Sequence, residues 1–255
     1  MIQYNKERPL RVFTAFSGYD SQCLALDRLK ETFPEFEYEL VGWSEIDKYA
    51  IQAHNALYPQ WADRNYGDIS KIDWNQVPDF DLFTYSSPCQ DFSVAGLQKG
   101  GDEGSGTRSS LLWECRKAIE IKRPRFALLE NVKALVSKKF YPLFMDWDST
   151  LVSLGYYNWW QVLNSTDYEN PQNRERVFLV SCLDNIQYQF PEPMELPYCV
   201  ADILDYDSIN QYRINRQTER EFIESLDMER LEKEARFADE RGLTVDESEI
   251  DDEDV

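Results

Sequence analysis

The chain has 255 residues, of which 42% are hydrophobic and 14% aromatic, a composition typical of one globular domain with a small appendage. Its formal net charge of −20 excludes a broadly basic surface for nucleic acid, because phosphate contacts need lysine and arginine. Residues 239–255 hold nine acids and one base, a net −8, which leaves −12 on the rest of the chain. Any nucleic-acid contact must therefore come from a local basic patch or from a partner.

Targeting signals, cysteines and histidines narrow the class further. No run of about 18 apolar residues predicts a membrane span, and the first residues, MIQYNKERPLRV, contain no apolar signal core. We therefore expect a cytoplasmic protein. The five cysteines are too scattered for a disulfide framework or a zinc knuckle. The single histidine, His54, excludes a His-rich metal site, and we expect no metal.

Strand-like and helical segments alternate through most of the chain. Strands are predicted at residues 11–16, 38–44, 80–85, 126–130, 159–163 and 176–181. Helices are predicted at residues 21–32, 49–58, 109–122 and 140–154. This alternation predicts an α/β fold, with a mostly parallel sheet and helices on both faces. Ligands bind such sheets at the carboxyl ends of the strands.

The pattern changes after residue 190. Three prolines, at 191, 193 and 197, mark an irregular connection. Residues 217–241 predict one charged helix, in which pairs such as Glu229 and Lys233 suit a solvated face. Residues 246–255 predict a disordered acidic tail.

The first strand ends carry residues suited to a small-molecule ligand. Ser17 and Gly18 form a turn where the backbone can approach a ligand, and the following helix offers free N–H groups, although an ordinary turn is equally compatible. Glu45 follows the second strand, where a carboxylate can accept hydrogen bonds from ribose hydroxyls. Alternatively it can cap a helix, as Asp47 can. Asp68, in GDIS, can accept a hydrogen bond from an adenine amino group or close a turn.

A reactive cysteine is the strongest single candidate. Cys89 stands at a strand end behind the rigid Pro88, a position that favours a nucleophile, although a lone cysteine is more often structural. The glycine-rich residues 90–107 predict a mobile lid, or a long solvent loop.

Charged residues follow at the next strand ends. Glu130 closes an apolar run, where partial burial would keep a proton available, and its alternative is a capping or ion-paired acid. Alternation along a strand places Arg174 and Arg176 on one face and Glu175 on the other. Two guanidinium groups on one face suggest recognition of a carbonyl or phosphate oxygen, or pairing with Glu130.

Taken in order, FSG, Glu45, GDIS, SSPCQ, ENV and QNRER resemble the DNA cytosine-5 methyltransferase family, particularly its short bacterial and phage members. The resemblance covers about residues 10–182. It implies a Rossmann-like fold of the S-adenosylmethionine-dependent methyltransferases, with that cofactor, and DNA as the partner whose target cytosine is flipped out. It also implies a cofactor-binding catalytic domain at residues 1–190, a short helical extension at 191–245 and the tail at 246–255.

The resemblance assigns roles to individual residues. It implies cofactor contacts from Phe16, Ser17, Gly18, Glu45, Ile46, Asp68, Ile69, Ser86 and Pro88. It implies catalysis by Cys89, Glu130, Arg174 and Arg176, and substrate contacts from Gln90, Ser93, Asn131 and Gln172. Attack of the cysteine on cytosine C6 would activate C5, while Glu130 stabilises charge at N3 and Arg176 binds O2.

Two departures from the family pattern leave alternatives open. Asp20 and Ser21 stand where the family often has two glycines. Both can cap a helix, which would preserve cofactor binding, but an acid at position 20 could repel the cofactor carboxylate. No target-recognition region or final family motif is recognisable after residue 190. A complete cytosine-5 DNA methyltransferase is the main hypothesis. The others are half of a split enzyme completed by a second polypeptide, a non-catalytic regulatory relative, and an RNA cytosine methyltransferase.

Overall fold

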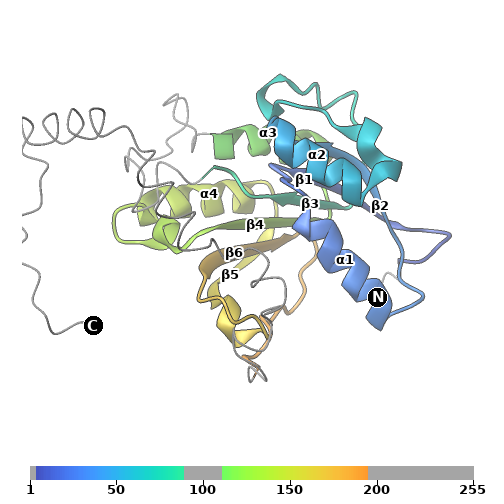
Figure 1. The fold of residues 1–255 in the computed structure, drawn as a ribbon. Helices are drawn as coiled ribbons and strands as arrows, with labels where there is room; N and C mark the ends of the chain where they lie inside the picture. Colours follow the sequence, from blue (N-terminus) through green and yellow to red (C-terminus); the bar gives the residue numbers. More distant parts are fainter. Residues whose placement is uncertain (1–3, 89–110, 195–255) are drawn as a thin grey trace, which may run out of the picture. The chain divides into compact units, whose positions relative to one another are not determined.

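A computed structural model describes residues 4–88 and 111–194, and six strands in this part of the chain form one sheet (Figure 1). The strands are β1 Leu10–Ala15, β2 Tyr38–Ser44, β3 Leu82–Tyr85, β4 Phe126–Val132, β5 Tyr157–Asn164 and β6 Glu175–Cys182. Their order across the sheet is β2-β1-β3-β4-β6-β5. The first four strands pair in parallel, whereas β6 runs antiparallel to both β4 and β5. The predicted, mostly parallel sheet is confirmed.

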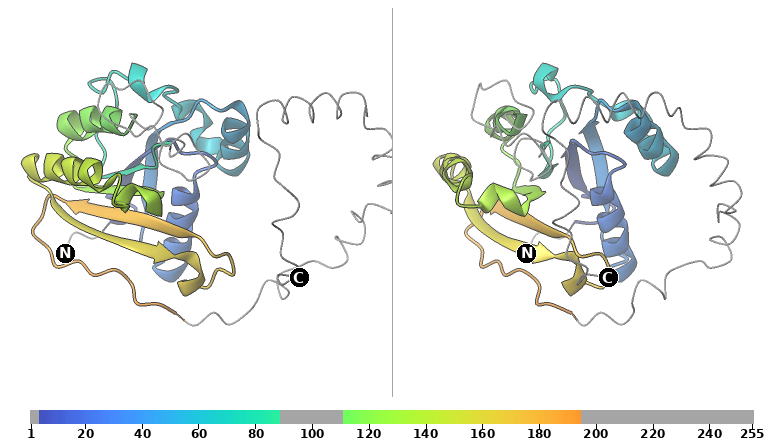
Figure 2. Two further views of the ribbon diagram at one scale, coloured as in Figure 1. Left: turned by 90° about the vertical axis from the view of Figure 1, so that its left-hand side faces the viewer. Right: turned by 60° about the vertical axis from the view of Figure 1, so that its left-hand side comes forward.

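Within these described ranges, four α-helices cover the sheet from both sides, as Figure 2 shows. On one side lie α1 (Ser21–Thr32) and α2 (Lys48–Leu57), and on the other lie α3 (Leu112–Lys122) and α4 (Tyr141–Ser153). Aspartates begin the first two helices. Asp20 accepts a hydrogen bond from the Cys23 amide, and Asp47 accepts from the next two free amides of α2.

The two faces of the sheet hold separate apolar cores, because side chains alternate along each strand. On β1, Phe13 and Ala15 point into the core shared with α3 and α4, while Leu10 and Val12 point into the core shared with α1 and α2. Phe13 lies among aromatic rings, 5.0 Å from the ring centroid of Trp74. Each fully buried side chain of this size contributes about 1.5–3 kcal/mol, so these contacts fix which face of each strand is inside.

Several boundaries differ from the predicted ones for local physical reasons. Strand β1 ends at Ala15 and not at Phe16, since Phe16 has a φ of 56°, outside the extended region. Strand β4 continues through Val132, because its pairing with β6 extends as far as Val132 opposite Arg176. The predicted helix at 217–241 and the tail at 246–255 lie outside the described residues.

Candidate active site

The strand directions bring most of the predicted site residues to one edge of the sheet. Parallel strands β1 to β4 all end at this edge, and the antiparallel β6 begins there. The segments that meet the edge are 16–18 after β1, 45–46 after β2, 86–88 after β3, 130–131 at the end of β4 and 174–176 at the start of β6. The fold therefore gathers residues separated by up to about 160 positions in the sequence.

The turn after β1 has an unusual backbone. Phe16, Gly18 and Asp20 all have positive φ values, of 56°, 58° and 68°. Non-glycine residues in this conformation are strained, and such strain persists only where surrounding contacts hold it. The Ser17 amide donates to the Ser44 carbonyl at 3.2 Å, and the Asp20 amide donates to the Ser17 carbonyl at 2.8 Å. The turn is thus tied to the end of β2.

Glu45 connects this turn to the start of α2. Its Oε2 accepts a hydrogen bond from the Gly18 amide at 2.9 Å. Its Oε1 accepts from the amides of Ile46 and Asp47 at 2.8 and 2.9 Å. Because each carboxylate oxygen can accept two hydrogen bonds, Oε2 keeps capacity for a further donor such as a ligand hydroxyl. The adjacent Ile46 side chain is 72% exposed and offers an apolar surface.

Asp68 and Ile69 follow the chain segment that passes beside β2. Asp68 accepts hydrogen bonds from the hydroxyl of Ser70 at 2.8 Å and from its amide at 3.0 Å. These hydrogen bonds, with Lys71 nearby, lower the pKa of Asp68, so its carboxylate is an acceptor at neutral pH. Asp68 thereby closes a turn. Ile69 is buried and packs in the core with α3 and α4.

The end of β3 is held by a hydrogen bond from Asn131 to Ser87, a residue that the sequence did not single out. Asn131 Nδ2 donates to the carbonyl oxygen of Ser87 at 3.1 Å and lies 3.3 Å from the Ser87 hydroxyl. Both residues are buried, and Asn131 Oδ1 accepts from the Val132 amide. The Asn131 side chain thus joins β4 to the segment that leads into Pro88, and its contact with substrate stays a prediction. The Ser-Ser-Pro sequence before Cys89 was the only local signal for Ser87.

Glu130 and Arg176 form an ion pair across β4 and β6. Arg176 Nε lies 3.0 Å from Glu130 Oε1, and the side chains are 21% and 29% exposed. Arg176 stands opposite Val132, and Phe178 stands opposite Glu130, so the pair is a diagonal one on a single face of the antiparallel ladder. A carboxyl and a guanidinium are thus held together at the edge of the sheet, where both are partly exposed to solvent.

Other predicted site residues are less enclosed or lie outside the described part. Arg174 and Gln172 are exposed, and their backbone groups bond to Asn164 and Ser165 on the neighbouring segment. Ser86 is half-buried, and its amide donates to the Ala15 carbonyl. Cys89, Gln90 and Ser93, together with the predicted lid, fall in residues 89–110 outside the described ranges.

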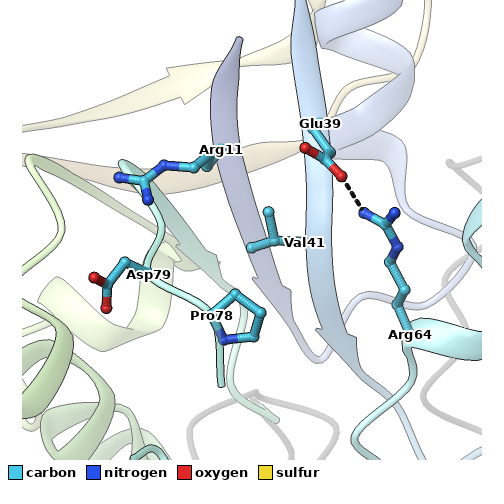
Figure 3. A pocket seen from close by; sticks show the side chains of 6 residues that line it. All are labelled: Arg11, Glu39, Val41, Arg64, Pro78 and Asp79. Atoms are coloured by element: carbon cyan, nitrogen blue, oxygen red, sulfur yellow. Dashed lines mark hydrogen bonds and ion pairs between the residues drawn. The ribbon is translucent and has the colours of Figure 1, made fainter. Parts of the chain in front are cut away.

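The described residues contain no cluster of three metal-binding side chains, and no helix among them is both long and apolar enough to cross a bilayer. A hollow of about 440 Å³ lies near the opposite ends of β1 and β2, and Figure 3 shows the side chains that line it. Its lining residues are Arg11, Glu39, Val41, Arg64, Pro78 and Asp79. The charged groups there pair with protein partners, as Arg64 does with Glu39 at 2.7 Å. We therefore place the candidate site at the carboxyl edge and not in this hollow.

The sheet, the helices on both faces and the residues gathered at its carboxyl edge define a Rossmann-like methyltransferase fold. Among solved structures, the Entamoeba histolytica methyltransferase EhMeth superimposes with a TM-score of 0.60 at 17% identity, over 74% of this chain and 58% of that one. That likeness concerns the fold. The family profile of the C-5 cytosine-specific DNA methylases matches residues 10–250, and the chain belongs to this family.

Curated relatives agree with the family assignment. The type II methyltransferase M2.ScrFI of Lactococcus lactis subsp. cremoris is 39% identical, over 77% of this chain and 68% of that protein. The orphan methyltransferase M.Rho11sI of Bacillus phage rho11s is 38% identical, over 69% of this chain and 34% of that protein. The matches therefore span between about a third and two thirds of the lengths of these relatives.

Proposed function

We propose that this chain transfers a methyl group from S-adenosylmethionine to C5 of cytosine in DNA, through a covalent adduct of Cys89 at C6. The observation that carries the proposal is the Glu130–Arg176 pair at the carboxyl edge of the sheet, 3.0 Å between Nε and Oε1. The neighbouring Asn131–Ser87 bond holds the strand end that leads to Cys89. Membership of the cytosine-5 methylase family supports the same reaction.

The residues after β1 and β2 fit the cofactor. The Ser17 hydroxyl is buried and has no hydrogen-bond partner among the described residues, so a polar group is free beside Gly18. Glu45 has capacity to accept hydrogen bonds from the ribose hydroxyls of the cofactor, and Ile46 offers an apolar face to its base. Phe16, Asp68, Ser86 and Pro88 complete the proposed set. When bound, S-adenosylmethionine supplies an electrophilic methyl group on a sulfonium sulfur.

The chemistry of the remaining residues follows from the weak nucleophilicity of cytosine C5. The Cys89 thiolate forms a bond to C6, and Glu130 holds a proton at N3 as electron density moves into the ring. Arg176 donates to the base O2 and, through its ion pair, keeps Glu130 oriented. Attack at C6 would leave C5 nucleophilic enough to accept the methyl group that the bound cofactor would supply. Water removes the C5 proton, and expulsion of Cys89 restores the ring.

Positioning roles fall to the remaining predicted residues. Arg174 and Gln172 stand at the same edge of the sheet as Glu130 and would hold the site together around the target base. Gln90 and Ser93 would contact the flipped nucleotide, which must leave the helix to reach Cys89.

The test is nucleoside mass spectrometry after incubation of the full chain and S-adenosylmethionine with unmethylated duplex DNA, and in parallel with RNA. The control is Cys89→Ser, checked for folding by circular dichroism. We expect 5-methylcytosine from DNA with the unmodified chain alone. Product from RNA alone would contradict the DNA substrate, and product from neither would contradict a self-sufficient enzyme.

A second arm tests the covalent step directly. In the presence of S-adenosylmethionine, duplex DNA carrying 5-fluorocytosine should form a stable adduct with the chain, because fluorine at the methylated C5 cannot leave as the proton does and Cys89 is then not expelled. The adduct should be visible on a denaturing gel and absent with Cys89→Ser. Methylation without a trapped adduct would contradict attack by Cys89.

A further inference from the structure

Asp20 lies directly beneath the turn proposed to bind the cofactor. Its side chain is fully buried, and its backbone is left-handed, with φ 68° and ψ 61°. Oδ2 accepts from the Thr14 hydroxyl at 2.8 Å, and Oδ1 accepts from the Cys23 amide at 3.2 Å. The carboxylate therefore points into the protein and away from the carboxyl edge, so it is not placed to repel a cofactor carboxylate there.

His54 is the one side chain of α2 that reaches this carboxylate. It is fully buried, and its ring stacks on Trp43, with centroids 3.7 Å apart and planes inclined by 20°. Its Nε2 lies 3.5 Å from Asp20 Oδ2 and has no hydrogen-bond partner among the described residues. Burial of a carboxylate is costly unless polar groups surround it, and the imidazole Nε2 is one of the polar atoms that face Asp20.

Other groups that face the pair are already engaged elsewhere. Tyr38 donates its hydroxyl to Asp27 at 2.8 Å, and the hydroxyl of Tyr58 lies 3.4 Å from the same carboxylate. Burial raises the pKa of the Cys23 thiol, and the Asp20 carboxylate raises it further, so Cys23 is a neutral neighbour. Of these neighbouring side chains, His54 is thus the one whose ring nitrogen faces the Asp20 carboxylate.

Asp20 and His54 connect the same two segments that the Gly18–Glu45 hydrogen bond connects, namely the turn after β1 and the segment from the end of β2 into α2. Asp20 follows Gly18 by two positions, and His54 belongs to α2, which begins just after Glu45. The Gly18–Glu45 hydrogen bond joins the turn to this segment at the surface, and the Asp20–His54 contact joins them underneath. Trp43, two positions before Glu45, is fixed by the stacked imidazole.

We infer that Asp20 and His54 are positioning residues that hold Gly18 and Glu45 at the separation needed to bind S-adenosylmethionine. The inference rests on the proposed function, since it concerns the same cofactor site. Neither residue is expected to touch the reacting atoms. Their effect is exerted on the affinity for the cofactor through the backbone of the turn.

The experiment uses the fact that His54 is the single histidine of the chain. Two-dimensional ¹H–¹⁵N spectra of the imidazole therefore report one residue without assignment, and calorimetry gives the dissociation constant of S-adenosylmethionine. The variants are Asp20→Asn, which keeps the shape and removes the charge, and His54→Phe, which keeps a ring to stack on Trp43. Tyr156→Phe is the matched control, because it removes a buried hydrogen bond to the Pro124 carbonyl in the other core.

We expect the cofactor to shift the imidazole signals of the unmodified chain. We also expect each pair variant to weaken cofactor binding by about tenfold, because loss of the Asp20–His54 contact releases the turn that carries Gly18. The control should lower the melting temperature without changing affinity.

Two results would overturn the inference, and they are distinguishable. If the unmodified chain binds the cofactor while the imidazole signals and the variants' affinities stay unchanged, the pair is merely structural and the proposed function stands. If calorimetry detects no binding by the unmodified chain, the proposed cofactor itself fails, and the inference fails with it. The imidazole titration needs no variant, so the question is decided even if His54→Phe does not fold.

Discussion

The Asn131 side-chain amide donates to the main-chain carbonyl of Ser87 at 3.1 Å, 44 positions away in the sequence. The bond joins the end of β4 to the segment just after β3, and both partners are buried. The orientation of the amide is consistent, since its oxygen accepts from the Val132 amide. The residue beside Glu130 thereby controls the backbone that leads into Pro88 and Cys89.

Removing this bond should lower both stability and turnover. Asn131→Ala leaves the buried Ser87 carbonyl without this donor, so the free energy of unfolding should fall by roughly 1–3 kcal/mol. The methylation rate constant should fall as well, because the bond holds the backbone that leads into Pro88 and Cys89. Urea unfolding and single-turnover assays measure the two effects. Asn75→Ala, at an exposed turn, is the control and should change neither. An unchanged rate for Asn131→Ala would contradict its positioning role.

The Glu130–Arg176 pair should matter much more for reaction than for stability. Both side chains are partly exposed, and such pairs stabilise a fold by about 0–1 kcal/mol. Loss of a group that stabilises developing charge lowers the rate by about 10²-fold or more. A double-mutant cycle with Glu130→Gln and Arg176→Gln should therefore show small coupling in unfolding and large losses in rate. Lys133→Met is the control, because it breaks the exposed Lys133–Glu175 pair nearby and should stay active. Full activity of Glu130→Gln would refute the mechanism.

Two glycines should respond differently to alanine. Gly18 has a φ of 58° and open space where a Cβ would stand, so Gly18→Ala should cost about 1–2 kcal/mol through backbone strain and weaken cofactor binding. At Gly42 a Cβ would meet Phe13 and Tyr66 ring atoms at 2.7 Å, so Gly42→Ala should cost about 1–3 kcal/mol through overpacking. Gly42→Ala should leave the cofactor affinity of the folded fraction unchanged. Thermal unfolding and calorimetry distinguish the two, and equal affinities for both variants would count against a cofactor role for Gly18.

Asp81 should make stability depend on acid pH. Burial alone would raise the pKa of Asp81. Arg11 donates two side-chain hydrogen bonds to this carboxylate, at 3.0 and 3.1 Å, and a third from its backbone amide. Together these hydrogen bonds outweigh burial and lower the pKa of Asp81. A lowered folded-state pKa contributes stability above the ordinary value of 3.8, and that stability is lost as pH falls through the folded value.

The corresponding measurement compares the unmodified chain with Asp81→Asn by urea unfolding at several pH values. The difference in unfolding free energy should be constant from neutral pH to about pH 5 and should shrink below about pH 4. Asp79→Asn is the control, since that carboxylate is 72% exposed and its pair with Lys122 should add little. A difference for Asp81→Asn that persists unchanged to pH 3 would contradict the ion pair as its source.

Local sequence determined the strands and helices of the described residues and which residues follow each strand. Apolar periodicity marked the elements, and Asp20 and Asp47 marked the starts of α1 and α2. The ordered set of strand-end residues also indicated the family, which the comparisons confirmed. These features depend on neighbouring residues, so a sequence can specify them without knowledge of strand order.

Only the tertiary structure decided which distant groups meet. Arg176 reaches Glu130 because β6 enters the sheet antiparallel to β4, and Asn131 reaches Ser87 because β3 and β4 are adjacent. Asp20, an acid that could have repelled the cofactor carboxylate, turns inward toward His54, because a left-handed backbone directs its side chain beneath the turn. The helix pattern alone gave no signal for His54. Strand order, direction and side-chain burial arise from contacts between segments far apart in the chain, and no local pattern encodes them.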